Sequence, residues 1–235
     1  MSHAEKQAVS STAAPSRWAR WLLLVVVAAC LYVNYYYNAH PPAGALSNGQ
    51  MSARHPTLLT PAGYAFSIWG VIFGGLVVYA IWQMLPRQRQ SMLAAALTPP
   101  LTLAVLTTTA WTLAFSYEQL GVSMLIMLLL LAALAWAYAR TRPLVLASTV
   151  PGWPAWFLSL YLGWIMLATV LNLTLGLRDA LGWQLPSPAV LPANLLLALL
   201  ATGTALLLAW RGRDPLLPLP VAWGLLGAWV AQHGT

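Results

Sequence analysis

Seven long stretches of apolar residues, separated by shorter polar connections, dominate this sequence. They run over residues 18–37, 62–84, 96–117, 120–139, 154–177, 189–210 and 216–232. A helix needs about 20 apolar residues to cross the hydrocarbon core of a bilayer, and the first six stretches reach that length. The seventh is shorter and follows Pro215, Pro218 and Pro220. We predict an all-α polytopic membrane protein, a bundle of about seven transmembrane helices.

Charged residues are scarce: they make up 6% of the chain, whereas apolar residues make up 60%. A soluble domain carries charged residues at about a quarter of its positions. The chain therefore has too few of them to be an ordinary soluble globule. Its net charge of +7 comes from bases scattered in ones and twos rather than gathered into a stripe, which argues against a nucleic acid partner.

The distribution of the basic residues predicts an orientation. Lysine and arginine stay preferentially on the cytoplasmic side of a membrane. Sorted by the predicted spans, nine of the 11 fall on one side: Lys6, Arg17, Arg20, Arg87, Arg89, Arg140, Arg142, Arg211 and Arg213. Arg54 and Arg178 fall on the other side. We expect a multi-pass protein of a bacterial inner (plasma) membrane, with a cytoplasmic amino terminus.

The first span could instead be the apolar part of a signal peptide. Arg17 and Arg20 precede it, and Val27-Ala-Ala-Cys30 resembles a lipoprotein cleavage box. The apolar character continues past Cys30 through residues 31–33, whereas the chain after a lipoprotein cleavage site should turn polar. We therefore predict that this span is retained.

Several kinds of membrane chemistry are disfavoured by what the spans lack. The only lysine is Lys6, so no span supplies the lysine that a retinal protein needs for its Schiff base. The four acids, Glu5, Glu118, Asp179 and Asp214, lie in the tail or at span ends, not at the midplane where pumps place them. The sequence also has no Gly-x-Ser-x-Gly, His-Glu-x-x-His or phosphate-binding glycine motif. An enzyme is the less favoured interpretation.

Three histidines, His40, His55 and His233, fall on the outer side of the predicted topology. Histidine can bind haem iron or a transition metal. Their spacing matches no metal motif, and solvated loop histidines are the simpler interpretation. The single cysteine, Cys30, allows neither an internal disulfide nor a thiolate cluster. We predict no metal site.

Most of the 13 tryptophans lie near span ends, where this residue type anchors membrane proteins at the water interface. The predicted anchors are Trp18, Trp21, Trp82, Trp136, Trp153, Trp156, Trp183 and Trp210. Trp69, Trp111 and Trp164 differ because they lie well inside predicted spans. These three rings are candidates for lining a site within the membrane.

The fifth span presents a face with both aromatic and polar character. Tyr161, Trp164, Ala168 and Asn172 are spaced three, four and four residues apart, so they share one side of a helix. An asparagine in hydrocarbon needs a hydrogen-bond partner. We therefore expect this face to turn toward the bundle rather than toward lipid.

The second span carries a stripe of small residues. The stripe consists of Gly63, Ser67, Gly70 and Gly74, and it includes a Gly-x-x-x-Gly unit. Such stripes let neighbouring helices approach closely in membranes. We predict close helix contact along this face.

The longest connection, residues 38–61, is polar and rich in proline, glycine and asparagine. Connections of this length without an evident helix or strand are usually functional or disordered. Rings and one amide within the spans, with this loop above them, would suit a flat apolar ligand. Ordinary packing between helices is the alternative interpretation for each residue.

Three segments together resemble the tryptophan-rich sensory protein family, also called the translocator protein family. The segment from Pro61 to Phe73 is similar to the family's Pro-x-x-Trp-x-Phe-Gly-Pro-x-Trp-x-x-x-Tyr, with Tyr64 in the first tryptophan place and one residue fewer before Trp69. Trp111, Phe115 and Gln119-Leu-Gly121 resemble the end of the third span. Residues 161–172 resemble the fifth span, Pro-Tyr-x-x-Trp-x-x-x-Ala-x-x-x-Asn, with Leu160 replacing the proline.

The resemblance implies a division of the chain and a set of ligand-binding residues. Residues 1–17 would be a cytoplasmic tail, 18–177 a five-helix translocator-like core, and 178–235 an extension of one or two helices. Members of the family bind tetrapyrroles such as porphyrins, sterols and synthetic aromatic ligands in a pocket closed by the first loop. The residues implicated by position are Tyr64, Phe66, Trp69, Trp111, Phe115, Tyr161, Trp164, Ala168 and Asn172.

Our leading hypothesis is a membrane receptor or sensor for a flat hydrophobic ligand, either porphyrin-like or sterol-like. A small-molecule transporter is the alternative, and a membrane enzyme that modifies the ligand comes third. No resident cofactor is required, although the ligand itself could be haem or another tetrapyrrole. The expected partners are the bilayer and the ligand, with a second copy of the chain also considered.

Overall fold

The computed structural model describes residues 15–182 and 187–233, and within these ranges every regular element is a helix. The α-helices are α2 (Arg17–Ala39), α3 (Asn48–Arg54), α4 (Ile68–Trp82), α5 (Met92–Ser116), α6 (Leu120–Leu146), α7 (Trp156–Leu181), α8 (Ser187–Gly212) and α9 (Leu219–His233). The short 3-10 helices are η1 (Gly63–Ser67), η2 (Pro86–Gln88) and η3 (Trp153–Ala155). Most of the predicted tail, with Glu5 and Lys6, and the predicted anchor Trp183 lie outside the described residues.

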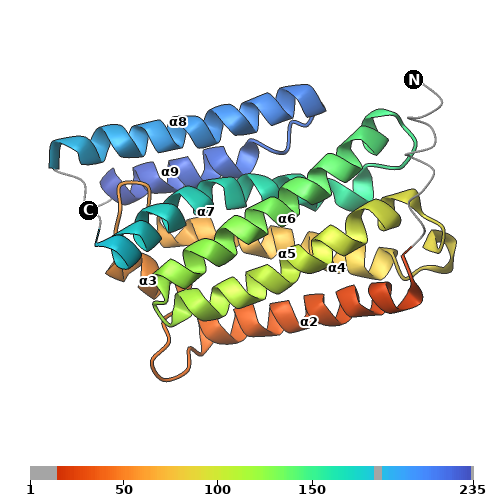
Figure 1. The fold of residues 1–235 in the computed structure, drawn as a ribbon, viewed down its shortest axis with the longest axis horizontal. Coiled ribbons are helices and arrows are strands. Elements are labelled where there is room, and N and C mark those ends of the chain that lie inside the picture. Colours follow the sequence, from red (N-terminus) through yellow and green to blue (C-terminus); the bar gives the residue numbers. More distant parts are fainter. Residues whose placement is uncertain (1–14, 183–186, 234–235) are drawn as a thin grey trace.

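The long helices lie side by side along the longest axis of the molecule (Figure 1). α2 contacts α4 and α5, α5 contacts α6, and α7 contacts both α4 and α6, which closes a five-helix bundle. α8 and α9 pack on the outside of α7. Among the described residues, six helices are long and apolar enough to cross a membrane, in agreement with the first six predicted spans. With 15 residues, α9 is shorter than a membrane-spanning helix.

The connection at 38–61 holds a short helix, α3, that was not predicted from the sequence. Ser47 accepts a hydrogen bond from the backbone N–H of Gln50, and the Gln50 side chain accepts one from the backbone N–H of Ser47. This reciprocal capping box satisfies two donors at the first turn and starts α3. The Ser-x-x-Gln spacing was the available signal, but the glycine and polar residues around it obscured the short helix.

The predicted small-residue stripe is wrong as a contact surface. A Cβ atom built on Gly63, Gly70 or Gly74 would meet no atom within 4 Å, whereas one on Gly75 would overlap the Phe157 side chain. The contact between α4 and α7 therefore depends on Gly75. Gly70 and Gly74 lie on the exposed face of α4, opposite the buried face that carries Ile72, Leu76 and Tyr79. Gly63 precedes α4 in the tighter 3-10 turn of η1, so it does not continue their helical register.

Hydrogen bonds between side chains on different helices link the inner bundle. Thr112 of α5 donates to Asn34 of α2 at 3.1 Å. At the other end of α5, Thr98 donates to the Gln83 amide oxygen at 2.8 Å. The last carbonyl groups of a helix have no hydrogen-bond donor within that helix. Arg20 of α2 supplies such a donor at the end of α4, where its guanidinium donates to the Gln83 carbonyl at 2.9 Å. These bonds fix how α2, α4 and α5 align along their length.

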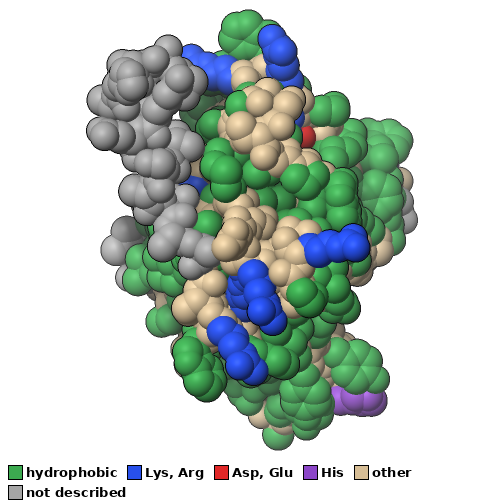
Figure 2. All heavy atoms as spheres, turned by 90° about the vertical axis from the view of Figure 1, so that its right-hand side faces the viewer, with side chains coloured by type: hydrophobic (Ala, Val, Ile, Leu, Met, Phe, Trp, Pro, Cys, Tyr) green, Lys and Arg blue, Asp and Glu red, His purple; other side chains and the backbone are tan. Residues whose placement is uncertain are grey.

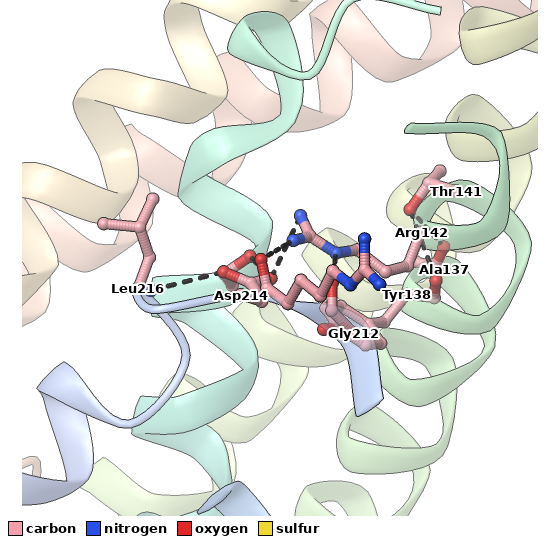
Figure 3. A network of polar contacts seen from close by, with 9 residues as sticks. Ala137, Tyr138, Thr141, Arg142, Gly212, Asp214 and Leu216 are labelled. Carbon is pink, nitrogen blue, oxygen red and sulfur yellow. Dashed lines mark hydrogen bonds and ion pairs between the residues drawn. The ribbon is translucent and has the colours of Figure 1, made fainter. Parts of the chain in front are cut away.

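A second polar network holds the turn between α8 and α9 against α6 and α7 (Figure 3). The Asp214 carboxylate is buried, accepts a hydrogen bond from Ser159 at 2.6 Å and lies 3.4 Å from an Arg142 nitrogen. Arg142 also donates to the carbonyls of Gly212 and Arg213. The α8–α9 hairpin is therefore tied to the bundle at this end by a charged pair.

The described arginines of the predicted cytoplasmic side gather at the end of the molecule where this network lies. At this end α2 begins and the α4–α5, α6–α7 and α8–α9 connections meet (Figure 1). Figure 2 shows basic side chains spread among apolar ones on this face. We call it the arginine-rich end. The clustering of these arginines at one end agrees with the side to which the sequence assigned them.

We predict that Asp214→Asn destabilises the protein by about 2 kcal/mol, because Arg142 loses a buried carboxylate partner. Thermal unfolding in detergent, followed by circular dichroism, measures the change. Arg140→Ala is the matched control, since the half-buried Arg140 guanidinium lies over the exposed Trp136 ring of the same helix. Equal unfolding temperatures for Asp214→Asn and the parent would contradict a stabilising role for the network.

Candidate ligand pocket

A small cavity of about 50 Å³ lies among α4, α5 and α7, toward the end opposite the arginine-rich end. Its walls are largely aromatic and aliphatic, and residues of α3 and of the following loop lie across one side. The lining residues are Met51, Ser52, His55, Thr60, Pro61, Phe66, Trp69, Trp111, Phe115, Met127, Trp164, Leu167, Ala168, Leu171, Asn172 and Leu175. The cavity is thus an apolar space with a few polar groups at its edge.

A hydrogen bond between an indole and an amide forms one wall. Trp111 Nε1 of α5 donates to Asn172 Oδ1 of α7 at 2.9 Å, and both side chains are buried. Ser123 of α6 lies 3.4 Å from the same oxygen, and the Asn172 amide nitrogen donates to the Ala168 carbonyl at 3.0 Å. The Trp111 ring stacks on Phe115 with centroids 4.9 Å apart. The expected partner of Asn172 is therefore Trp111.

Another part of the lining is built from rings in edge-on and stacked contacts. Phe66 of η1 contacts Trp164 of α7, with centroids 6.1 Å apart and planes at 81°. Trp69 of α4 stacks on Phe73 at 5.1 Å. Aromatic rings favour such offset and edge-on contacts over face-to-face sandwiches. Because Phe66 belongs to η1, its position depends on how η1 is held against the bundle.

Seven of the nine residues implicated by the family resemblance line this cavity. They are Phe66, Trp69, Trp111, Phe115, Trp164, Ala168 and Asn172. Their convergence from η1, α4, α5 and α7 gives the predicted site a common location. That they contact a ligand stays a prediction.

The structure does not bring Tyr161 and Tyr64 to the cavity. Tyr161 is fully buried nearer the arginine-rich end, with its hydroxyl hydrogen-bonded to Thr108 and its ring against Trp69. Tyr64 is 44% exposed and packs edge-on against Trp223 of α9. The one-residue difference from the family spacing and the 3-10 geometry of η1 both turn Tyr64 away from the cavity.

The part of the lining that comes from α3 and the loop after it was not predicted from the sequence. Met51, Ser52 and His55 belong to or follow α3, while Thr60 and Pro61 precede η1. The long loop was expected above the pocket, but nothing in its sequence identified which side chains face inward. We call residues 51–61 the pocket roof.

The roof is tied to the bundle by an ion pair beside the cavity. His55 Nε2 lies 2.9 Å from Glu118 Oε1, and Arg54 Nε lies 3.1 Å from the same oxygen. Glu118 stands in the turn between α5 and α6 with a positive φ of 57°. A positive φ is uncommon for a residue other than glycine, and here it accompanies the contact of the Glu118 carboxylate with the roof.

A family profile described as TSPO-like protein matches residues 20–235. The chain belongs to the TSPO-like family. Together with the six apolar helices, this membership makes it an integral membrane protein. No curated protein and no solved structure gives a significant match.

The TSPO-like match continues through α8 and α9, beyond the five spans that carry the resemblance in the sequence. A translocator-like core at 18–177 and an extension at 178–235 stay a predicted division of the chain. The family profile therefore covers both C-terminal helices, α8 and α9.

We predict that Trp111→Phe destabilises the protein by about 1 kcal/mol, because Asn172 then lacks its indole donor within the bundle. Trp136→Phe is the control, since that ring lies on the exposed side of α6. Unfolding midpoints in a denaturing detergent series measure both variants. If the two substitutions have equal effects, the Trp111–Asn172 hydrogen bond does not stabilise the fold.

Proposed function

We propose that this protein is a membrane receptor of the TSPO-like family that binds a flat hydrophobic ligand in the cavity among α4, α5 and α7. The observation that carries the proposal is the convergence of Phe66, Trp69, Trp111 and Trp164 around one space with a polar group, Asn172, at its edge. Ligand sites in proteins are typically apolar and aromatic, with a few convergent polar groups. The rings offer flat faces, and Asn172 offers one oriented amide.

The size of the cavity requires the pocket to open when a ligand binds. Its 50 Å³ holds a few water molecules, whereas sites for drug-sized ligands enclose roughly 300–1,000 Å³. The roof is the part best placed to move, because residues 55–61 after α3 have no regular secondary structure and the ionic contact with Glu118 is partly exposed. We infer that the roof moves to enlarge the cavity when a ligand binds.

Porphyrin-like tetrapyrroles and sterols are the ligand classes that these walls would suit. Both are rigid and largely flat, so they lose little conformational freedom when they enter a slot between rings. A tetrapyrrole would stack on the tryptophan faces and would enter as a ligand rather than as a resident cofactor. The bilayer would be the reservoir for such an apolar molecule, and no second copy of the chain is needed to complete the walls.

The interior on the arginine-rich side of the cavity favours a receptor over a carrier. Tyr161, Tyr79 and Phe157 are fully buried there and contact one another or Trp69 through their rings. They fill the bundle between the cavity and the arginine-rich end. A transporter would need a path through this aromatic layer, so the ligand would enter and leave on one side.

The proposed orientation places the arginine-rich end in the cytoplasm of a bacterial cell. Lysine and arginine remain preferentially on that side of the inner membrane. The cavity and its roof would then lie in the outer half of the bilayer. A ligand would approach from the outer leaflet or the external face.

We predict that protoporphyrin IX quenches tryptophan fluorescence of the purified protein saturably. In Trp164→Ala the dissociation constant should rise at least about tenfold, because a ring of the wall is lost. Trp210→Ala, which removes a ring 77% exposed on α8, is the control and should match the parent. Indistinguishable dissociation constants for all three proteins would show that porphyrin does not occupy this cavity.

Flux measurements separate the receptor from the carrier. We predict no saturable uptake of porphyrin into proteoliposomes containing the parent protein, since the aromatic layer around Tyr161 closes the bundle. Empty liposomes give the background rate. Saturable uptake that Asn172→Leu abolishes would establish the transporter instead.

A further inference from the structure

α9 packs against the start of the second span, close to the pocket. Trp223 Nε1 donates a hydrogen bond to the Ala65 carbonyl of η1 at 3.0 Å. The Trp223 ring meets Tyr64 edge-on, with centroids 5.3 Å apart and planes at 79°. A 3-10 helix of five residues has few hydrogen bonds of its own, so this external support restricts how η1 can move.

Two glycines let α9 approach the pocket wall at backbone distance. A Cβ atom on Gly227 would lie 2.9 Å from the Ala65 Cβ and 3.0 Å from the Pro61 Cβ. One on Gly224 would overlap Leu167 and lie 3.3 Å from the Trp164 ring. The Gly227 carbonyl also accepts a hydrogen bond from Ala62 N at 3.0 Å. Any larger side chain at either position would push α9 away from η1 or α7.

α9 contacts residues that line the cavity and one residue next to a lining residue in the sequence. Pro61, Trp164 and Leu167 line it directly, and Ala65 precedes Phe66. α9 contacts η1 on one side and α7 on the other. It therefore covers the seam between the second and fifth spans, which bounds the cavity on one side.

The other end of α9 is held independently. The Asp214 carboxylate, five residues before α9, pairs with Arg142 and Ser159 (Figure 3). The Leu217 carbonyl lies against Gly163 of α7 so closely that a Cβ atom there would overlap it. α9 is thus fixed at its start to α6 and α7 and along its length to the pocket wall.

We propose that α9 is a positioning element of the ligand pocket: through Trp223, Gly224 and Gly227 it holds η1 against α7 and seals the seam of the pocket toward lipid. The ligand then exchanges through the roof rather than sideways between the second and fifth spans. The inference rests on the proposed function for the identity of what occupies the pocket. The seal itself is a property of the protein without ligand.

The rate at which a thiol inside the cavity is alkylated tests the seal directly. Cys30→Ala removes the single native cysteine, and Ala168→Cys places a thiol in the cavity of the full-length protein. N-ethylmaleimide labelling is then followed by mass spectrometry in lipid nanodiscs. Trp223→Phe, which keeps a ring but loses the donor to Ala65, should raise the rate about fivefold, as should Gly227→Ala.

Trp229→Phe is the matched control because it changes the same residue type on the exposed face of α9. It should label at the rate of the parent. The proposal is overturned if Trp223→Phe and Gly227→Ala label no faster than the parent, or if Trp229→Phe accelerates labelling equally.

A protoporphyrin IX titration of the parent, run in parallel, separates this inference from the proposed function. Faster labelling of Trp223→Phe and Gly227→Ala, with no porphyrin binding by the parent, would support the seal and reject the ligand. Saturable porphyrin binding with unchanged labelling of both variants would support the ligand and reject the seal.

Discussion

Hydrogen bonds between helices are the interactions on which this structure depends. In hydrocarbon, an apolar side chain gains little by leaving lipid for another helix, so close packing and polar pairs must hold a bundle together. Thr112 with Asn34 joins α5 to α2, and Trp111 with Asn172 joins α5 to α7. The second pair also forms a wall of the cavity. The contact that orders the bundle therefore also positions the Asn172 amide at the edge of the cavity.

The spans and the inward face of the fifth helix were predictable because each follows from properties of a single helix. Hydropathy over about 20 residues located the long helices, and helical spacing put Trp164, Ala168 and Asn172 on one side. The partner of Asn172 was not predictable, since it depends on how two helices align. Tyr64 was misplaced because a 3-10 turn, invisible to hydropathy, sets its direction.

The C-terminal helices change how the pocket is understood. A five-helix core would leave the seam between η1 and α7 facing lipid, whereas here α9 lies over that seam through two glycines and one indole donor. The family profile extends across these helices as well. We therefore regard α8 and α9 as part of the proposed receptor's architecture, with the roof as the element that must move to admit a ligand.

Photochemical crosslinking tests the central claim, that a flat ligand occupies the cavity among α4, α5 and α7. A porphyrin carrying a diazirine would be bound in nanodiscs, illuminated and mapped by peptide mass spectrometry. Our account predicts adducts on residues 111–115 and 164–175, suppressed by excess unmodified porphyrin. Adducts confined to the exposed leucines of α8, or unaffected by the competitor, would contradict it.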